Sequence, residues 1–324
     1  MQLGISESSP LKTYRRLVGN ATYHINTAVV GLEQLVQGHT AKPNDLTIRW
    51  DPPNDLRSAV NQSRGFILSA ALILTISACD SYISDIARIP WMVLDHEQRL
   101  KAKGAITRKG GAEYSIADRL AALIMGISPC NFDDDDLKVG LAILELATLW
   151  RNAVVHMKSK QISSRAKDTL LANRERLHKN NGAIDIDLML NHFQNNVRPT
   201  LKETTTIISI VSRFIKTVDI GLIRTSIPSQ DAMRRILFHS LALVFDECSK
   251  TTINNCFVSD REAKQRRFQQ ALAKAGVTDS KAVISPLISL EEVLCLTQSE
   301  VEASMTLNRF PPIEFLTTQH KNET

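Results

Sequence analysis

Apolar residues recur along most of this chain at spacings of three and four, which is the pattern of helices that bury one face. The first such segment has a narrow apolar seam that suits packing lengthwise along another helix. The seam consists of Tyr14, Val18, Ala21, Ile25, Ala28, Leu32 and Leu35. Ser9 as N-cap and Pro10 at the first helical position open this helix, and Gly38 and Pro43 end it.

A second, longer helix is predicted to run to about Arg88 from Asn54 or Asp55, either of which can cap it. Similar signals predict the remaining helices: a short one within 91–114, then 115–125, 137–158, a basic tract ending near 182, 199–218, 231–248, 259–276 and 289–307. Strand signals are few, the clearest being an extended piece at 46–50 and a brief alternation at 184–188. We therefore predict an all-α fold.

The 324 residues of the chain are enough for about two domains. Asp219-Ile220-Gly221 and the polar segment 225–231 together predict a boundary. We expect a helical bundle over 9–218 and a C-terminal helical region of unknown role over 219–324.

Composition adds little that is specific to a function. Aromatic residues make up only 5% of the chain, so the core must consist mostly of aliphatic side chains. The formal net charge of +5 is compatible with a nucleic-acid partner but does not identify one.

Sequence features favour a cytoplasmic protein without a membrane anchor. The segment 1–10 lacks the charged-then-apolar pattern of a secretory signal. The longest apolar run, Phe66 to Cys79, is shorter than the about 20 residues of a membrane span, so we predict a buried helix there. The five cysteines are scattered and form no CxxC, which argues against a disulfide framework and a zinc knuckle.

The most informative stretch is Leu137–Lys158, whose first two-thirds is apolar almost all round, as in a fully buried helix. Without a Gly or Pro the helix then continues into Arg151, Asn152 and His156. Burying these three polar side chains costs desolvation free energy unless they face a cleft, a partner subunit or a ligand.

Arginine and histidine together suit phosphodiester chemistry. The guanidinium of Arg151 is a permanent cationic fork that matches a phosphate, and the imidazole of His156 titrates near neutral pH and can transfer a proton. Five positions separate the two residues by about 140° around an ideal helix, whereas Asn152 and His156 lie side by side. One ligand could still reach both side chains, or two copies of the helix could meet and pool them. No metal is needed when the 2′-hydroxyl of RNA is the nucleophile.

The sequence LWRNAVVH, set in this apolar helix, resembles the motif of the HEPN superfamily, which is an Arg, a polar residue directly after it, and a His a few residues later. The layout is also similar, with a long helix ending SACDSYISDIAR before the motif and an IDIDL segment with a further helix after it. The resemblance covers roughly 9–218 and leaves 219–324 unaccounted for.

The resemblance implies a helical bundle with a four-helix core that pairs as a homodimer, with both motifs lining one cleft. It also implies a metal-independent endoribonuclease of a toxin–antitoxin or antiphage defence system, with RNA as substrate and an antitoxin or another defence protein as a partner. Arg151 would then bind the scissile phosphate, Asn152 would orient the site, and His156 would act as general acid or base. Asp80 and Asp85 match no motif, and we expect capping or solvation to explain them better than a role in positioning the site.

Two alternatives of a different class remain. Some HEPN-like proteins are non-catalytic modules that bind nucleotide or RNA or serve as scaffolds. The segment 259–288 could also be the helix-turn-helix of a DNA-binding regulator, although Pro286 interrupts its second helix.

Other clusters have plain structural explanations. The acids at 133–136 suit the N-terminus of the central helix better than a calcium site, because calcium-binding loops usually carry a turn glycine. The basic tract after His156 is either a solvated helix face or a phosphate-contacting surface; it contains Lys158, Lys160, Arg165, Lys167, Arg174, Arg176 and Lys179. His239, Cys248 and Cys256 suit helix packing better than zinc binding. Because no GxSxG, P-loop or GxGxxG occurs, we expect no ATP or redox cofactor. We also expect no bound metal, because the cysteine, histidine and acidic clusters have these structural explanations.

Overall fold

The fold is mostly helical, as the sequence predicts. The computed structural model describes residues 2–38, 45, 47, 51, 53–127, 134–156, 161–246, 257, 260–274, 277–278, 283–297 and 299. The main elements of the bundle are α1 (Ser9–Val36), α2 (Leu56–Ile86), α3 (His96–Ala102), α4 (Ile116–Met125), α5 (Asp134–His156), α6 (Ser164–Ala172), α7 (Arg174–Asn180), α8 (Ile186–Gln194) and α9 (Leu201–Ser226). The elements that follow are α10 (Gln230–Asp246), α12 (Arg261–Lys274) and α13 (Leu290–Leu294), with three short strands, β1 (Gln2–Ile5), β2 (Val277–Thr278) and β3 (Ile288–Ser289).

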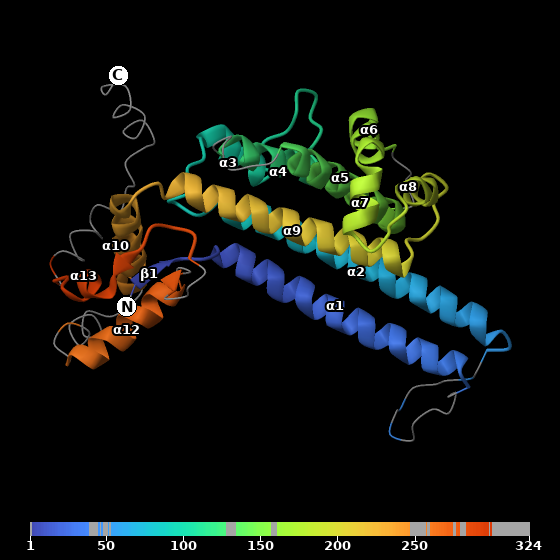
Figure 1. Cartoon of the computed structure of the whole chain (residues 1–324), viewed down its shortest axis with the longest axis horizontal. Helices are drawn as coiled ribbons and strands as arrows, with labels where there is room; N and C mark the ends of the chain where they lie inside the picture. Colours follow the sequence, from blue (N-terminus) through green and yellow to red (C-terminus); the bar gives the residue numbers. More distant parts are fainter. Residues whose placement is uncertain are drawn as a thin grey trace.

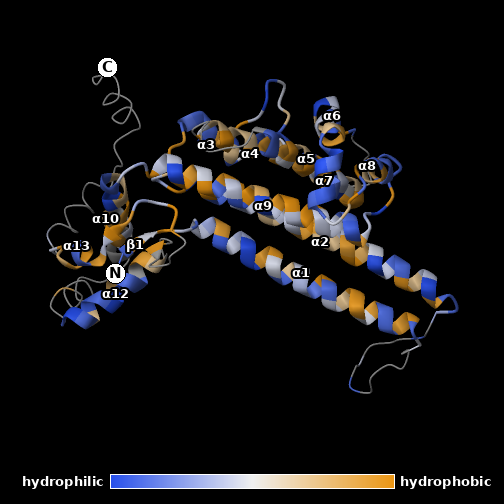
Figure 2. Cartoon of the chain, in the orientation of Figure 1, coloured by the Kyte–Doolittle hydropathy of each residue, from blue (hydrophilic) through white to orange (hydrophobic). Residues whose placement is uncertain are grey.

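Four long helices form the core. α1 lies lengthwise along α2, with α9 beside α2 and α5 on the far side of α9 from α1 (Figure 1). The predicted seam of α1 is buried from Tyr14 to Ile25, and the alternation of apolar and polar residues along α1 and α9 is visible in Figure 2. α5 and α9 approach so closely that a Cβ atom on Gly140 would lie 2.4 Å from the ring of Phe214.

The helix starts follow the capping signals with small shifts. Ser8, not Ser9, is the N-cap of α1, because its side chain accepts from the backbone N–H of Leu11. Asp55 rather than Asn54 caps α2. Ser115 caps α4 as predicted. The segment at 184–188, which alternates in sequence, starts helix α8 because Asp185 caps it.

Buried polar groups tie the C-terminal half of α2 to its neighbours. The carboxylate of Asp219 on α9 is fully buried and accepts from the backbone N–H of Ser8 at 2.9 Å, from the Ser8 hydroxyl and from the Tyr82 hydroxyl at 3.2 Å. Burial raises the pKa of Asp219 from 3.8 to about 6, although the bonds from Ser8 and Tyr82 act in the opposite direction. Nearby, Arg99 donates to the carbonyls of Ala87 and other residues beyond the end of α2.

The predicted boundary at 219–221 falls inside α9, which continues to Ser226. The helix continues because Asp219 is not a solvated linker residue but a buried one with partners, and the apolar residues Leu222 and Ile223 after it are also buried. The expectation that this helix ends near Val218 is therefore wrong.

The C-terminal region includes a small sheet that the sequence pattern did not predict. β1, from the N-terminus of the chain, pairs antiparallel with β2 and β3 in the order β2-β1-β3. Residues 2–5 thus pack with the region after α9, next to α10 and α12 at one end of the bundle (Figure 1). Strands this short have too few residues to display an alternating pattern.

The helix-turn-helix hypothesis for 259–288 is wrong. α12 is its first helix, but 277–278 form strand β2 and 283–289 contain no helix. The helix predicted over 289–307 is also shorter, because α13 ends at Leu294. The predicted extended piece at 46–50 lies almost wholly outside the described residues, as do Asp133, Lys158, Lys160, Cys248 and Cys256.

Candidate functional site

The Arg151–His156 motif lies where α5 leaves the core. The helix is buried or nearly so from Val139 to Trp150, and the next four residues are half-buried. Val155, one turn after Arg151, is 45% exposed. The polar residues therefore do not lie inside a packed interior, but at the surface end of a core helix.

Within the motif, Asn152 holds the guanidinium of Arg151. Arg151 donates from Nη1 to the Asn152 side-chain oxygen at 2.9 Å. The Nε of Arg151 is buried and has no hydrogen-bond partner within the described part of the chain. An amide oxygen neutralises no charge, so within the described residues no carboxylate offsets the positive charge of this guanidinium.

His156 is the last residue of α5. Its side chain lies outside the described atoms, so only its helical position is known. That position is four residues after Asn152, which places both residues on one face of the helix. The structure thus brings Arg151 and Asn152 into contact and places His156 one turn further along.

Trp150 anchors this end of α5 to the segment between α8 and α9. Its indole N–H donates to the carbonyl oxygen of Val197 at 3.1 Å, and its ring packs edge-on against Phe193 at 5.9 Å between centroids. The indole is fully buried, so its N–H needs this acceptor. The contact fixes Arg151 relative to the segment that carries Arg198.

The segment between α8 and α9 is fixed by hydrogen bonds at its start and at its end. The buried carboxylate of Glu203 binds the His192 ring at 2.8 Å and the backbone N–H of Thr200 at 2.7 Å, which completes a capping box. The backbone N–H of Val197 donates to the carbonyl of His192 at 2.9 Å. Arg198 therefore projects from a fixed backbone.

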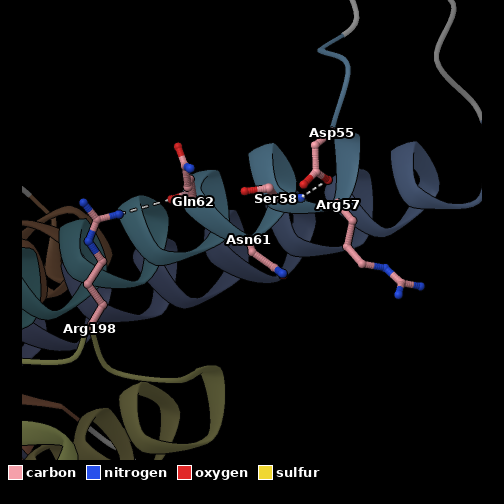
Figure 3. Close-up of a pocket in the computed structure, with 6 residues that line it drawn as sticks. All are labelled: Asp55, Arg57, Ser58, Asn61, Gln62 and Arg198. Atoms are coloured by element: carbon pink, nitrogen blue, oxygen red, sulfur yellow. Dashed lines mark hydrogen bonds between the residues drawn. The ribbon is translucent and has the colours of Figure 1, made fainter.

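Arg198 borders an open hollow of about 570 Å³ on the N-terminal part of α2 (Figure 3). The other lining residues are Asp55, Arg57, Ser58, Asn61 and Gln62. Arg198 donates to the carbonyl of Gln62 at 3.4 Å, and the Asp55 carboxylate accepts from the backbone N–H of Ser58 at 2.9 Å. No sequence pattern singles out Arg57 or Arg198, because each belongs to no motif and the two are far apart in sequence. The weak signal that existed was their position next to predicted helix starts.

The two acidic residues considered for a role in positioning the site, Asp80 and Asp85, both form ion pairs with arginines of the fold. Asp80 forms an ion pair with Arg119, which also binds Ser84 and the carbonyl of Ala102, so Asp80 joins α2 to α4. Asp85 pairs with Arg88 on the surface at 3.1 Å.

The acids that open α5 also have basic neighbours. Asp136 pairs with Arg176 at 2.7 Å, and Asp135 lies 3.9 Å from Lys138. Across the residues that the structure describes, no three His, Cys, Asp or Glu residues cluster as metal ligands would. The described members of the basic tract lie on α6 and α7, where Arg165 and Arg174 are exposed and Arg176 is half-buried.

α2 is the one helix among the described residues that is long and apolar enough to cross a membrane. In its most apolar window 56% of the residues are buried inside the fold, as in the core helix of a soluble protein. The helix packs against α1, α4, α5 and α9.

Comparison with known proteins identifies no relative. No protein-family model, no curated protein and no solved structure matches this chain. The geometry of the motif and of the hollow is therefore the basis for any proposal about function.

Proposed function

We propose that this protein is a metal-independent endoribonuclease of the HEPN type, with Arg151, Asn152 and His156 as its site. The observation that carries the proposal is the Arg151 guanidinium, held by an amide instead of a carboxylate at the surface end of a core helix, with a histidine one turn further along. The four long helices α1, α2, α5 and α9 match the number of core helices expected of such a bundle.

The proposed reaction needs only these groups and the RNA. The ribose 2′-oxygen attacks the adjacent phosphorus, the bond from phosphorus to the 5′-oxygen breaks, and a 2′,3′-cyclic phosphate and a 5′-hydroxyl form. His156 takes the proton from the 2′-hydroxyl or gives one to the departing 5′-oxygen. Arg151 stabilises the charge that develops on the phosphate oxygens.

A homodimer would supply the second proton-transfer group. One imidazole cannot give and take a proton in the same step, whereas two copies of His156 facing one cleft could share these roles. Two exposed large apolar side chains support such a pairing, because Val155 within the motif is 45% exposed and Phe66 on α2 is 70% exposed. Phe66 follows Gly65, against which the Arg198 side chain lies.

The biological setting is part of the same proposal. A ribonuclease of this type would act in the cytoplasm, where its RNA substrate lies, within a toxin–antitoxin or antiphage defence system. An antitoxin or another defence protein would then hold it inactive until a trigger releases it. The region after α9 is the candidate surface for such a partner.

The second candidate is a non-catalytic module that binds RNA or nucleotide. The hollow that contains Arg57 and Arg198 favours it, because that hollow offers cationic and amide groups but no histidine. The two candidates differ in one property: the binding module retains RNA without cutting it.

The test is cleavage of a labelled RNA in the presence of EDTA. The wild-type protein should produce cyclic-phosphate ends, and the His156→Ala variant should lose at least a hundredfold in rate while its thermal unfolding is unchanged. His178→Ala, which replaces an exposed histidine on α7, is the matched control and should cut at the wild-type rate. Binding without any cutting by the wild type would favour the binding module. Undiminished cutting by His156→Ala would reject the assignment.

A further inference from the structure

The hollow on α2 is lined by groups that bind phosphates, and these groups are arranged in a row that suits an extended polyanion. Two guanidinium groups, two amides and a hydroxyl line it, and its one carboxylate, Asp55, is engaged in capping α2. Figure 3 shows Arg57 near one end of the row and Arg198 at the other, with Ser58, Asn61 and Gln62 between them. The net charge of the lining residues is positive, so an anionic occupant is favoured.

The spacing of the two arginines favours an extended occupant over a single small anion. Arg198 reaches the carbonyl of Gln62, five residues after Arg57, which corresponds to about 7.5 Å along a helix axis. Because Arg57 and Arg198 lie near opposite ends, one phosphate would not bind both guanidinium groups at short range. Successive phosphates of a nucleic-acid strand would instead bind the two guanidinium groups one each.

The hollow is connected to the proposed reaction site through fixed contacts. Arg198 follows Val197, whose carbonyl binds the Trp150 indole, and Trp150 directly precedes Arg151. The hollow is thus linked to the residue before Arg151 by two fixed steps, and a strand that continues from the hollow to the end of α5 is part of the proposal below. Neither arginine has an acidic side-chain partner within the described ranges of the chain.

We propose that the hollow formed by Arg57, Ser58, Asn61, Gln62 and Arg198 is a subsite that holds the sugar–phosphate backbone of single-stranded RNA next to the Arg151 site. The inference rests on the proposed function for the identity of the substrate. Arg57 and Arg198 bind the phosphates, and the amides of Asn61 and Gln62 donate to phosphate or ribose oxygens. Such contacts position the strand without reading its bases.

Binding can be measured without cleavage if the His156→Ala background is used. A fluorescent single-stranded RNA of about 12 nucleotides is titrated with the full chain at several salt concentrations, and the slope of log K against log salt is determined. Arg57→Ala and Arg198→Ala should each reduce the slope by about 0.7 and weaken binding about fivefold at 0.1 M salt, because each removes one phosphate contact. Both residues are exposed, so the variants should unfold at the wild-type temperature.

The matched control is Arg16→Ala, which removes an equally exposed arginine from α1. Its slope should equal that of the background protein. The subsite is rejected if Arg57→Ala and Arg198→Ala leave slope and affinity unchanged, or if Arg16→Ala has the same effect, since binding would then depend on overall charge. Equal loss of affinity for single-stranded DNA of the same sequence supports backbone binding, whereas a loss confined to a duplex probe contradicts the single-stranded assignment.

The two proposals fail in distinguishable ways. If the subsite is correct and the nuclease is not, the slopes change as expected while the wild-type protein never cuts the RNA. If the nuclease is correct and the subsite is not, the wild-type protein cuts, and Arg57→Ala and Arg198→Ala bind and cut like it.

Discussion

The polar residues around the C-terminal half of α2 differ from the two arginines that line the hollow at its N-terminal half. Around the C-terminal half, which we call the closed end, Asp219, Arg99 and Arg119 each have several protein partners, and Asp80 is paired with Arg119. Around the N-terminal half, which we call the open end, Arg57 and Arg198 line a hollow on the surface of the bundle. Polar groups that satisfy one another hold a fold together, while those that keep free donors are available to a ligand.

The same contrast separates two arginines that are similar in burial. Arg119 at the closed end is bound by the Asp80 carboxylate, Ser84 and the carbonyl of Ala102. Among the described residues, Arg151 at the end of α5 has the Asn152 amide as its one side-chain partner, and its Nε is buried without a partner. The difference predicts that replacing Arg119 affects stability, whereas replacing Arg151 affects function.

The largest expected effect is on the proposed reaction. Arg151→Lys keeps the positive charge but loses the planar fork that matches both a phosphate and the Asn152 oxygen. Cleavage should fall by about a hundredfold to a thousandfold, comparable to the loss of one transition-state donor, while the melting temperature stays within a few degrees. Single-turnover cleavage and thermal unfolding measure the two quantities. A variant that cuts at the wild-type rate would show that a positive charge suffices there.

The next effect is on the closed end. Arg119→Ala leaves the carbonyl of Ala102 without its donor and breaks the ion pair with Asp80, so the free energy of unfolding should fall by about 2 kcal/mol. Arg88→Ala breaks an exposed pair with Asp85 and serves as the control, with a change of at most about 0.5 kcal/mol. Urea denaturation of both variants provides the comparison. Equal changes would mean that the closed end is no more dependent on its polar contacts than the surface is.

The pH dependence of the free energy of unfolding should show the titration of the buried Asp219 carboxyl. Because its folded-state pKa, about 6, lies above its ordinary value of 3.8, the folded state binds the proton more tightly. The contribution of this group to stability is therefore present below about pH 4 and is lost as the pH rises to about 6, by up to about 3 kcal/mol.

Asp219→Asn removes the titration and keeps an acceptor for Ser8 or Tyr82. The difference in unfolding free energy between the variant and the wild type should increase in favour of the variant from pH 4 to pH 6. Urea denaturation at pH 4, 5 and 6 measures it. Parallel pH profiles would contradict the burial of a titrating carboxyl at the closed end.

The smallest expected effect concerns the link between α5 and the open end. Trp150→Phe keeps a buried ring but leaves the carbonyl of Val197 without its indole donor, which should cost about 1 kcal/mol. The same change should weaken RNA binding only slightly, because Arg198 keeps its capped segment through Glu203 and Thr200. Denaturation and RNA titration in parallel separate the two effects.

The sequence predicted those parts of the fold that depend on local signals. Tyr14 to Ile25 form a continuous apolar seam, and Ser115 is a strong N-cap, so both helices are where the pattern places them. The boundary prediction at Asp219 was wrong because an acid two residues before a glycine resembles a linker, and only the fold brings Ser8 and Tyr82 to it. β1 could not be predicted because its partners lie more than 270 residues away.

The candidate site was predictable only in part. Arg151 and Asn152 adjoin in sequence, so a motif can find them, and their contact follows from local geometry. Arg57 and Arg198 come together because α9 runs parallel to α2 and starts beside the first turns of α2, a relation that no local pattern specifies. That no carboxylate among the described residues pairs with Arg151 could not be predicted either, since it depends on where the fold places the acidic residues.

The most direct test of the central claim is a double-mutant comparison of Arg151→Ala, His156→Ala and the double variant in single-turnover cleavage of one RNA. If the two side chains act on the same phosphodiester, the double variant should be about as slow as the slower single variant, because groups that act as a unit in catalysis are strongly non-additive. Rate losses that multiply, or a double variant that cuts as fast as the wild type, would show that Arg151 and His156 do not form one site.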